Sequence, residues 1–224
     1  MLSVRLPENR SMAECPVCEQ GQLQPFQAVK EQHYWRCQHC EATVLAEHCR
    51  LSADEEQAIY ALHQNEADDP GYRQFLSKLA EPLLEQLQPG MNGLDFGCGP
   101  GPVLADMFAD AGMAMSLYDP FFYDSAEVLA RQYDFLTCTE VVEHLYRPAD
   151  GFRRMDGLLR PGGWLGVMTC FQTDDARFAN WHYRRDPTHV VFYREHTLSV
   201  IAGQRGWELT IPCKDVALFR KPRR

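Results

Sequence analysis

Three glycines spaced two residues apart follow a short apolar segment near the middle of the chain. Segment 94–96 leads directly into Gly97, Gly99 and Gly101. Glycine has no Cβ and adopts positive φ at little cost, so such a loop can turn sharply and approach a ligand closely. The helix expected next would point its N-terminus at that ligand. The spacing therefore predicts a binding site for a nucleotide-like cofactor.

Four of the nine cysteines form two Cys-x-x-Cys pairs near the start of the chain. Cys15 and Cys18 form the first pair, and Cys37 and Cys40 the second, with 18 residues between the pairs. Segment 23–36 is long enough for a hairpin that brings four thiolates around one zinc ion tetrahedrally. The pattern resembles a zinc ribbon with one structural ion. A thioredoxin-like redox pair is the alternative, which two pairs ahead of any βαβ unit disfavour.

The remaining cysteines and the histidines near the two pairs are assigned no metal-binding or catalytic role. Because four cysteines complete the zinc site, His33, His39 and His48 are interpreted as surface residues. The remaining cysteines are interpreted as small buried or loop residues and not as nucleophiles. They are Cys49, Cys98, Cys138, Cys170 and Cys213.

The glycine spacing separates two classes of cofactor. A dinucleotide fingerprint has Gly-x-Gly-x-x-Gly and would need a glycine where this chain has Pro102. An acidic residue, one spacer and Gly-x-Gly-x-Gly instead resemble motif I of the class I S-adenosylmethionine-dependent methyltransferases. A dinucleotide enzyme and a non-binding relic of the fold are the alternatives.

The resemblance extends along the chain beyond the loop. After a helix expected over 103–111, a second strand over 114–118 ends in Asp119. An acidic residue about 20 positions after the loop can accept hydrogen bonds from both ribose hydroxyls. Segment 133–145 resembles the fourth strand of the family and its exit, and segment 160–169 resembles the turn and fifth strand.

The resemblance also implies which residues would contact S-adenosylmethionine. Asp95 would support the strand end and the amino-acid end of the cofactor, Asp119 the ribose, and Glu140 the methionine end. Phe121 or Phe122 would cover the adenine, and Cys98 would contribute its backbone. The predicted cofactor-binding residues are Asp95, Gly97, Cys98, Gly99, Gly101, Asp119, Pro120, Phe121, Thr139, Glu140 and Tyr72.

Three histidines are candidates for proton transfer. Methyl transfer is a direct displacement at a sulfonium carbon, so a nucleophile that carries a proton must lose it near the attack. Histidine titrates near neutral pH and suits that role. The catalytic candidates are, in order, His189, His182 and His144. A hydrogen-bonded structural histidine is the alternative for each, and alignment of donor and acceptor without a base is the alternative for the site.

These motifs need a scaffold that brings strand ends together. The resemblance implies a doubly wound α/β fold with a mostly parallel, Rossmann-like sheet of seven strands. Only 14 residues separate Asp119 from Asp134, too few for a full helix and a third strand, so that edge of the sheet is expected to be shortened. We divide the chain into a zinc-ribbon-like segment over 1–50, a helical connector over 51–90 and a methyltransferase domain over 91–224.

The connector is predicted to contain two helices. Ser52 and Glu55 form a capping box, and the apolar residues after Pro70 recur at helical spacing. We interpret these apolar stripes as packing on the sheet. The alternative is a lid over the cofactor formed by Tyr60, His63, Asn65 and Tyr72.

Composition limits the possible partners. The 224 residues are 45% hydrophobic, and no apolar run approaches the ~20 residues of a membrane span. The N-terminus lacks a signal-peptide core, so we expect a soluble, cytoplasmic protein. A net charge of −9 disfavours general nucleic-acid binding. Arginines interleaved with aromatic residues over 177–205 are interpreted as a face for an anionic or aromatic substrate, with solvated surface arginines as the alternative. RNA stays an alternative acceptor.

The residues after the fourth strand favour a small-molecule acceptor. Segment 139–142 lacks the Asn-Pro-Pro-aromatic motif of methylases that act on nucleic-acid bases, and segment 140–145 looks more like the quinone and small-molecule methylases. The sequence therefore predicts methyl transfer from S-adenosylmethionine to a small molecule that it does not identify. The alternative is a cofactor-sensing binding module, in which the ribbon recruits a partner and no turnover occurs.

Overall fold

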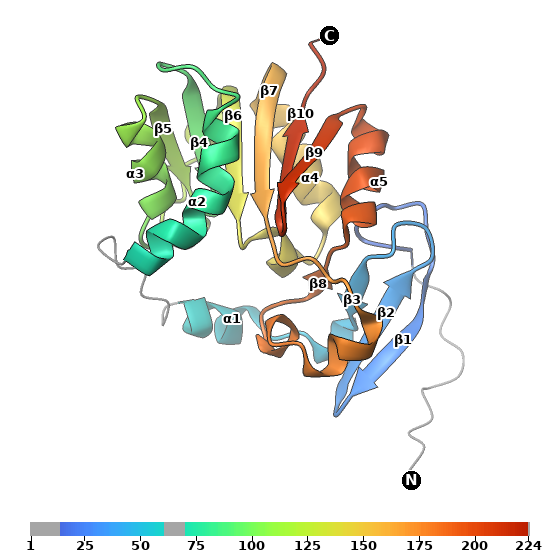
Figure 1. The fold of residues 1–224 in the computed structure, drawn as a ribbon. Coiled ribbons are helices and arrows are strands. Elements are labelled where there is room, and N and C mark those ends of the chain that lie inside the picture. Colours follow the sequence, from blue (N-terminus) through green and yellow to red (C-terminus); the bar gives the residue numbers. More distant parts are fainter. Residues whose placement is uncertain (1–13, 61–69, 224) are drawn as a thin grey trace.

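Two β-sheets lie next to each other in the computed structural model, which describes residues 14–60 and 70–223 (Figure 1). The smaller sheet has four strands and lies in the lower part of Figure 1. The larger sheet has six strands and carries helices on both faces. Within the described ranges, no helix has the length and apolar character needed to cross a membrane.

The small sheet is antiparallel and is built from both ends of the chain. Its strands, in spatial order, are β1 (Leu23–Val29), β2 (Gln32–Cys37), β3 (Thr43–Leu45) and β8 (Val191–Phe192). Strands β1 and β2 form the hairpin predicted between the cysteine pairs. Strand β8 pairs with β3, with Thr43 opposite Phe192 and Val44 opposite Val191. The N-terminal ribbon and a segment near residue 190 therefore form one sheet.

The large sheet has the strand order β5-β4-β6-β7-β10-β9. Its four parallel strands are β4 (Asn92–Phe96), β5 (Ala114–Tyr118), β6 (Tyr133–Thr139) and β7 (Leu159–Met168). Two antiparallel strands complete it, β9 (Glu208–Cys213) and β10 (Val216–Arg220). Strands β4 and β6 are mostly buried, as expected for parallel strands covered on both faces. The sheet is thus the predicted doubly wound, mostly parallel one.

The sheet has six strands where the resemblance implies seven. The difference lies beside β5, at the edge where the sequence predicted a shortened sheet. Between Asp119 and Tyr133 the fully described connection forms a single bridge, from Asp119 to Tyr123, and the 3-10 turn η2 (Val128–Ala130). So short a connection cannot hold both a helix and another strand. The expectation of seven strands was therefore wrong by one edge strand.

Strand β7 differs from its predicted start. The sequence placed a turn over 160–163 ahead of the strand, whereas β7 already begins at Leu159. Leu159 pairs with Tyr133 and Trp164 pairs with Phe135, so the turn interrupts the pairing of β7 with β6 as an irregularity in register. Pairing on both sides of the turn is what extends the strand.

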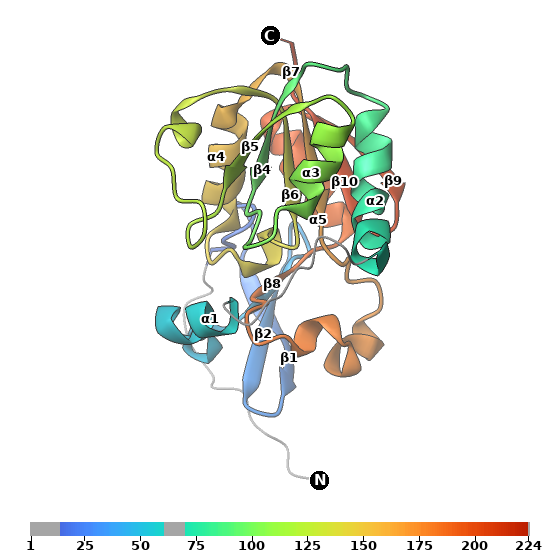
Figure 2. The same cartoon turned by 90° about the vertical axis from the view of Figure 1, so that its left-hand side faces the viewer.

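Helices cover both faces of the large sheet (Figure 2). The helices on its faces are α2 (Pro70–Leu84), α3 (Val103–Asp110), α4 (Pro148–Leu158) and α5 (Glu195–Arg205). On one face, Leu79 of α2 and Phe108 of α3 belong to one buried cluster. On the other, Phe152 of α4 and Ile201 of α5 belong to a second. The apolar stripe of α2 therefore packs on the sheet as predicted.

The connector begins with the predicted capping box. The backbone N–H of Ser52 donates to Glu55 Oε2 at 2.9 Å, and the N–H of Glu55 donates to Ser52 Oγ at 3.4 Å. Helix α1 (Ala53–Tyr60) follows. Of the proposed lid residues, Tyr72 lies on α2, whereas the side chain of Tyr60 and the whole of His63 and Asn65 lie outside what the structure describes.

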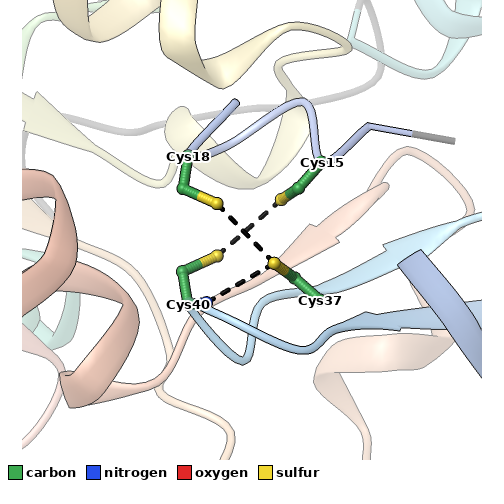
Figure 3. A group of neighbouring side chains, drawn as sticks. All are labelled: Cys15, Cys18, Cys37 and Cys40. Carbon is green, nitrogen blue, oxygen red and sulfur yellow. Dashed lines mark hydrogen bonds between the residues drawn. The ribbon is translucent and has the colours of Figure 1, made fainter. Parts of the chain in front are cut away.

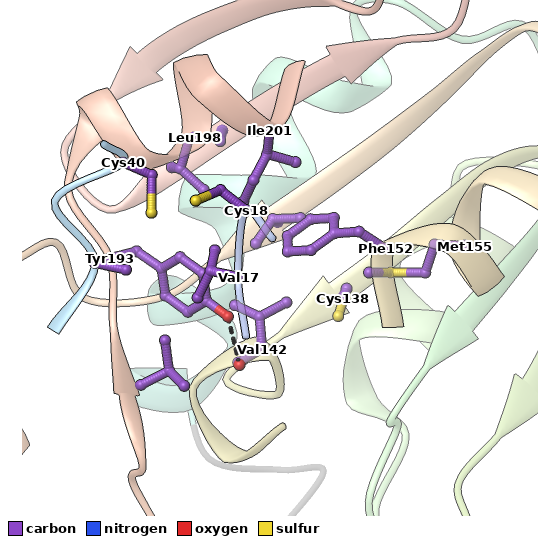
Figure 4. Packing of buried hydrophobic residues seen from close by; sticks show 14 of the residues in the cluster. Val17, Cys18, Cys40, Cys138, Val142, Phe152, Met155, Tyr193, Leu198 and Ile201 are labelled. Atoms are coloured by element: carbon purple, nitrogen blue, oxygen red, sulfur yellow. Dashed lines mark hydrogen bonds between the residues drawn. The ribbon is translucent and has the colours of Figure 1, made fainter. Parts of the chain in front are cut away.

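A continuous apolar core joins the ribbon to the large sheet (Figure 4). Val17, between the first two cysteines, is buried in the same cluster as Phe152 and Ile201. Tyr193, next to β8, is fully buried, and its hydroxyl donates to the carbonyl of Val142 at 2.8 Å. Burial of apolar area against the sheet fixes the position of the ribbon.

Candidate functional site

A cavity of about 560 Å³ opens at the carboxyl ends of β4, β5 and β6. Its size is typical of small-ligand sites, and ligands of doubly wound sheets bind at this edge. Helices α1 and α2 and the segment 182–189 complete its wall. All of the predicted cofactor-binding and catalytic residues line it, namely Tyr72, Asp95, Gly97, Cys98, Gly99, Gly101, Asp119, Pro120, Phe121, Thr139, Glu140, His144, His182 and His189.

The glycine loop is shaped by its own backbone. Gly97 and Gly99 have φ angles of 82° and 63°, in the left-handed region that favours glycine. A Cβ at Gly97 would lie 2.4 Å from Cγ2 of Val141, so no larger residue fits. The N–H groups of Gly97 and Cys98 donate to the carbonyl of Tyr118 at 2.7 and 3.2 Å. Burial raises the pKa of the Cys98 thiol to about 12, which is incompatible with a reactive thiolate.

Asp119 ties this loop to the end of β5. Its Oδ2 accepts a hydrogen bond from the N–H of Gly99 at 3.0 Å. Its Oδ1 accepts from the N–H groups of Phe121 and Phe122, at 2.9 and 3.2 Å. A carboxylate oxygen has two lone pairs, so Oδ2 retains acceptor capacity for a hydroxyl. The sequence indicated the ribose contact for Asp119 but not this second task of fixing the loop.

Asp95 is a buried carboxyl at the end of β4. It is 4% exposed, and its Oδ1 accepts a hydrogen bond from the hydroxyl of Thr137 at 2.7 Å. Burial raises its pKa to about 6, and the charge of Asp119 acts in the same direction. Tyr72 of α2 faces the same region, since burial and then the charge of Asp95 raise the pKa of its phenol.

These groups fit the polar end of S-adenosylmethionine. Among the described residues, no hydrogen-bond partner reaches the buried Oγ1 of Thr139, and a buried hydroxyl without a partner suits a polar ligand. The cradle at Gly97 gives a ligand access to the backbone. The carboxyl of Asp95 complements a cofactor that carries an ammonium and a sulfonium.

Glu140 and Glu143 lie at the exit of β6. Glu140 has a φ of 52°, which is uncommon for a residue with a Cβ and is found at functional sites. Burial, followed by the charge of Glu143, raises its pKa to about 9. Glu143 is fully buried and accepts a short hydrogen bond from the hydroxyl of Tyr183, which also contacts Thr169 Oγ1 at 3.1 Å. In the described chain, Glu143 Oε2 has no hydrogen-bond partner.

Two of the three histidine candidates lie together. Nδ1 of His189 donates to the carbonyl of Tyr183 at 2.8 Å, and Nδ1 of His144 donates to the carbonyl of Thr188 at 3.1 Å. In each ring Nε2 therefore carries the lone pair. The ring centroids are 4.7 Å apart. His189 is 7% exposed and burial lowers its pKa, whereas His182 is exposed at the rim of the cavity.

A group of possible metal ligands coincides with this pair. A carboxylate oxygen of Glu143 and ring nitrogens of His144 and His189 all lie within 4.8 Å of one another. Carboxylate and imidazole are ligands that several divalent cations accept. Sequence reasoning missed Glu143 and Tyr183. The spacing of Glu140, Glu143 and His144 in the sequence could have indicated a cluster of polar side chains. Only the fold brings Tyr183 and His189 next to Glu143.

The four predicted zinc ligands converge in the ribbon (Figure 3). The sulfur atoms of Cys15 and Cys40 are 3.7 Å apart, and those of Cys18 and Cys37 are 3.6 Å apart. A disulfide would need about 2.05 Å, whereas a tetrahedron with Zn–S bonds of about 2.3 Å has edges of about 3.8 Å. All four cysteines are buried, and the N–H of Val17 points at Cys15 Sγ at 3.4 Å. The donor set fits one structural zinc ion.

The fold is that of the class I S-adenosylmethionine-dependent methyltransferases. A family model described as a methyltransferase domain matches residues 66–210, more than half of the chain. The chain belongs to this methyltransferase domain family.

Curated relatives match part of the chain. Ubiquinone biosynthesis O-methyltransferase of Albidiferax ferrireducens is 32% identical over a region covering 36% of this chain and 41% of that protein. The enzyme of the same name from Pseudomonas aeruginosa is 28% identical over 42% of this chain and 40% of that protein. The match thus spans well under half the length of each curated relative.

Solved structures match the fold over most of the chain. The 1,6-didemethyltoxoflavin-N1-methyltransferase of Burkholderia thailandensis has a TM-score of 0.51 and 15% identity, covering 88% of this chain and 99% of that one. The magnesium protoporphyrin IX methyltransferase of Synechocystis with bound S-adenosylmethionine has a TM-score of 0.51 and 12% identity, covering 78% and 94%. At these identities the likeness establishes the fold alone.

Proposed function

We propose that this chain transfers the methyl group of S-adenosylmethionine to a hydroxyl of a small-molecule acceptor. The observation that carries the proposal is the single cavity wall shared by the glycine loop, Asp95, Asp119 and the buried His189. When bound, the cofactor supplies an electrophilic methyl group on a sulfonium centre. The relatives named as O-methyltransferases and the cavity of about 560 Å³ support a hydroxyl and a small acceptor, respectively.

The residues of the chain divide the work of binding and proton transfer. Asp119 and Gly97 hold the loop, Asp95 provides negative charge for the cofactor, and Glu140 lines the cavity as a carboxyl whose raised pKa keeps it neutral near pH 7. His189 is held by its Nδ1–H bond to the Tyr183 carbonyl, so Nε2 is the nitrogen that accepts the acceptor's proton. Alignment of acceptor and donor in a walled cavity supplies a large part of the rate.

A metal-assisted version of the same reaction is favoured by one observation. Glu143, His144 and His189 form a three-ligand group in which Glu143 Oε2 has no hydrogen-bond partner among the described residues. A divalent cation held there would lower the pKa of a bound hydroxyl. Manganese titration monitored by electron paramagnetic resonance distinguishes the two versions: the metal-assisted one requires binding that Glu143→Gln removes, and histidine acting alone requires none.

The first test of the proposal is cofactor binding. Calorimetry on zinc-loaded protein is expected to show one site for S-adenosylmethionine and one for S-adenosylhomocysteine. Failure of both to bind would overturn the enzyme assignment. Binding without turnover on a panel of phenols, catechols, sugars and short RNAs would favour the cofactor-sensing module, and turnover only on RNA would overturn the small-molecule acceptor.

The second test concerns the base. His189→Ala is expected to lower kcat by about 10²- to 10⁴-fold on an active acceptor, because general-base catalysis contributes in that range. Cofactor affinity is expected to stay unchanged, since His189 does not touch the glycine loop. His182→Ala, at the exposed rim, is the matched control. Equal losses in both variants would contradict the role of His189.

We also propose the setting of the reaction. Residues 91–224 form the catalytic domain, 51–90 the helical connector and 1–50 the ribbon, with one zinc ion on Cys15, Cys18, Cys37 and Cys40. None of the nine cysteines is in a disulfide, which suits the reducing cytoplasm as the compartment.

A further inference from the structure

A second cluster of metal-binding side chains lies in the ribbon, away from the four cysteines. His33, His48 and Cys49 each offer a ligand atom, and these atoms lie within 4.8 Å of one another. Nδ1 of His33 and Nε2 of His48 are 3.2 Å apart. We propose that His33, His48 and Cys49 form a second zinc site, exposed on the surface and separate from both the four-cysteine site and the cofactor cavity.

The local fold brings these three residues together although 14 positions separate the two histidines. His33 lies on β2, directly after the β1–β2 turn. His48 and Cys49 lie on the 3-10 turn η1 (Glu47–Cys49), which follows β3. The N–H of Ala46 donates to the carbonyl of His33 at 2.8 Å, and the N–H of Cys49 donates to the carbonyl of Ala46 at 2.9 Å. Backbone bonds thus hold η1 against the start of β2.

The distance between the two ring nitrogens is compatible with a shared metal ion. Zinc–nitrogen bonds of about 2.05 Å in a tetrahedron place two nitrogens about 3.4 Å apart, close to the observed 3.2 Å. The two rings meet edge to face, with centroids 5.3 Å apart. Two imidazoles and one thiolate are a ligand set that zinc prefers, with a fourth position left for solvent.

The site is independent of the four-cysteine site. His33 and Cys37 lie four residues apart on the same strand, which separates them by about 13 Å at a rise of about 3.3 Å per residue. His33 and Cys49 are half-buried and His48 is exposed, so an ion can enter from solvent.

Binding releases one proton for each ion. The Cys49 thiol, which donates to the carbonyl of Glu31 at 3.4 Å, loses its proton to the buffer and becomes a thiolate ligand. The neutral histidine that donates in the His33–His48 bond moves its hydrogen to its other ring nitrogen, so each imidazole presents a lone pair. No oxidation or reduction takes place.

An ion at this site would link η1, which leads into the connector, to strand β2 of the ribbon. Helix α1 begins at Ala53, a few residues after Cys49, and Glu56 of α1 lines the cofactor cavity. The carbonyl of Leu51, between the two, accepts a bond from the hydroxyl of Tyr146 at 3.1 Å. Occupation of the site would therefore fix the chain that leads to the cavity wall.

Cobalt titration tests the proposal on protein whose four-cysteine site already holds zinc. One additional Co²⁺ per chain is expected, with a thiolate-to-cobalt charge-transfer band, and no zinc is released. Cys49→Ser is expected to abolish the band, and His33→Ala or His48→Ala to weaken binding at least tenfold. Cobalt bound at Glu143, His144 and His189 would give no such band, because those ligands include no thiolate.

The matched control is His39→Ala. His39 is an exposed histidine of the same ribbon, outside the cluster, and its removal is expected to leave the cobalt band unchanged. A titration without a charge-transfer band at millimolar cobalt would overturn the site. A band that persists in Cys49→Ser, or that grows as zinc is released, would overturn it as well, since the thiolates would then come from elsewhere.

Discussion

The charged side chains on the cavity wall are acidic. Among the described lining residues there is no lysine or arginine. Such a wall attracts cations and disfavours anions, which suits a sulfonium cofactor. The same field disfavours an acceptor that carries a phosphate or a carboxylate, so a neutral or cationic acceptor fits the site best. The acidic residues are Glu56, Asp95, Asp119, Glu140 and Asp186.

Asp95 makes both stability and cofactor binding depend on pH. Its folded-state pKa of about 6 is above the ordinary value of 3.8. A raised folded pKa means that the neutral carboxyl contributes stability that is fully present below about pH 4 and is lost as pH rises through about 6. The loss at neutral pH is on the order of 3 kcal/mol. Asp95→Asn is therefore expected to stabilise the ligand-free chain at neutral pH, measured by urea unfolding, and to bring no gain near pH 4.

Cofactor affinity is expected to change in the opposite direction. The charged form of Asp95 attracts the ammonium of S-adenosylmethionine, so calorimetry is expected to show tighter binding as pH rises through about 6 in the natural chain. Asp95→Asn removes both this pH dependence and part of the affinity. Asp124→Asn, on the exposed loop after β5, is the control. If Asp95→Asn lowered the free energy of unfolding at neutral pH, the result would contradict the explanation that the buried charge of Asp95 destabilises the ligand-free chain.

Asp119 is expected to be the most sensitive cofactor residue to substitution. Asp119→Ala removes the acceptor for the N–H groups of Gly99, Phe121 and Phe122 as well as the ribose contact. We expect S-adenosylmethionine affinity to fall by about 1–3 kcal/mol, measured by calorimetry. Asp124→Ala again serves as the control. Unchanged affinity would refute the ribose contact.

At the level of residues, the sequence was most informative where chemistry is local. The zinc ligands and the glycine loop are each contained in short spacings, and the structure brings the four cysteines together and places the loop residues on one cavity wall. Their roles as zinc and cofactor ligands stay predictions. Glu143 and Tyr183 could not be paired from sequence, because 40 positions separate them and only the folded connection after β7 joins them. The surface interpretation of His33 and His48 also missed their contact, which depends on η1 turning back onto β2.

At the level of elements, the connection between β7 and β8, residues 169–190, carries part of the site and is hydrogen-bonded to the ribbon. Arg184, 8% exposed, donates to Gln32 Oε1 at 2.7 Å and to the hydroxyl of Tyr34 at 3.1 Å. Both partners lie on β2. The other end of the connection is held by the β3–β8 pairing. The ribbon therefore positions the segment that carries two of the catalytic candidates, His182 and His189.

Arg184→Ala tests whether these hydrogen bonds hold the connection on the ribbon. Loss of hydrogen bonds from a buried guanidinium is expected to lower the free energy of unfolding by on the order of 2 kcal/mol, measured by urea titration. Cofactor affinity is expected to change less than twofold, because the glycine loop lies on other strands. Arg185→Ala, an exposed neighbour, is the control. Equal destabilisation by both substitutions would contradict this role of the Arg184 hydrogen bonds.

Element boundaries were predictable where a single period or motif governs them. The capping box at Ser52 and the parallel strands β4 and β5 are confirmed. The extension of β7 to Leu159 was not predictable, since it comes from pairing with β6 and not from the residues of the turn. The same holds for β8, two residues long, which is a strand only because β3 lies beside it.

At the level of the whole molecule, one backbone position links the ribbon to the catalytic cluster. The carbonyl of Val190 accepts a hydrogen bond from the N–H of Leu45 in β3 at 2.8 Å. The N–H of Val190 donates to the carbonyl of Glu143 at 2.9 Å. The ribbon buries its apolar residues against the large sheet, and a zinc ion on its four cysteines would stabilise β3, the strand on which Val190 depends.

Zinc removal is therefore expected to loosen the acceptor side of the cavity more than the cofactor side. In Cys37→Ser, hydrogen exchange measured by mass spectrometry is expected to accelerate in β1 to β3 and in segment 188–193, because Val190 loses its partner on Leu45. Amides of β4 are expected to keep their protection, since they bond within the large sheet to β5 and β6. Segment 188–193 remaining protected would contradict the link, and equal acceleration in β4 would mean that zinc stabilises the chain as a whole.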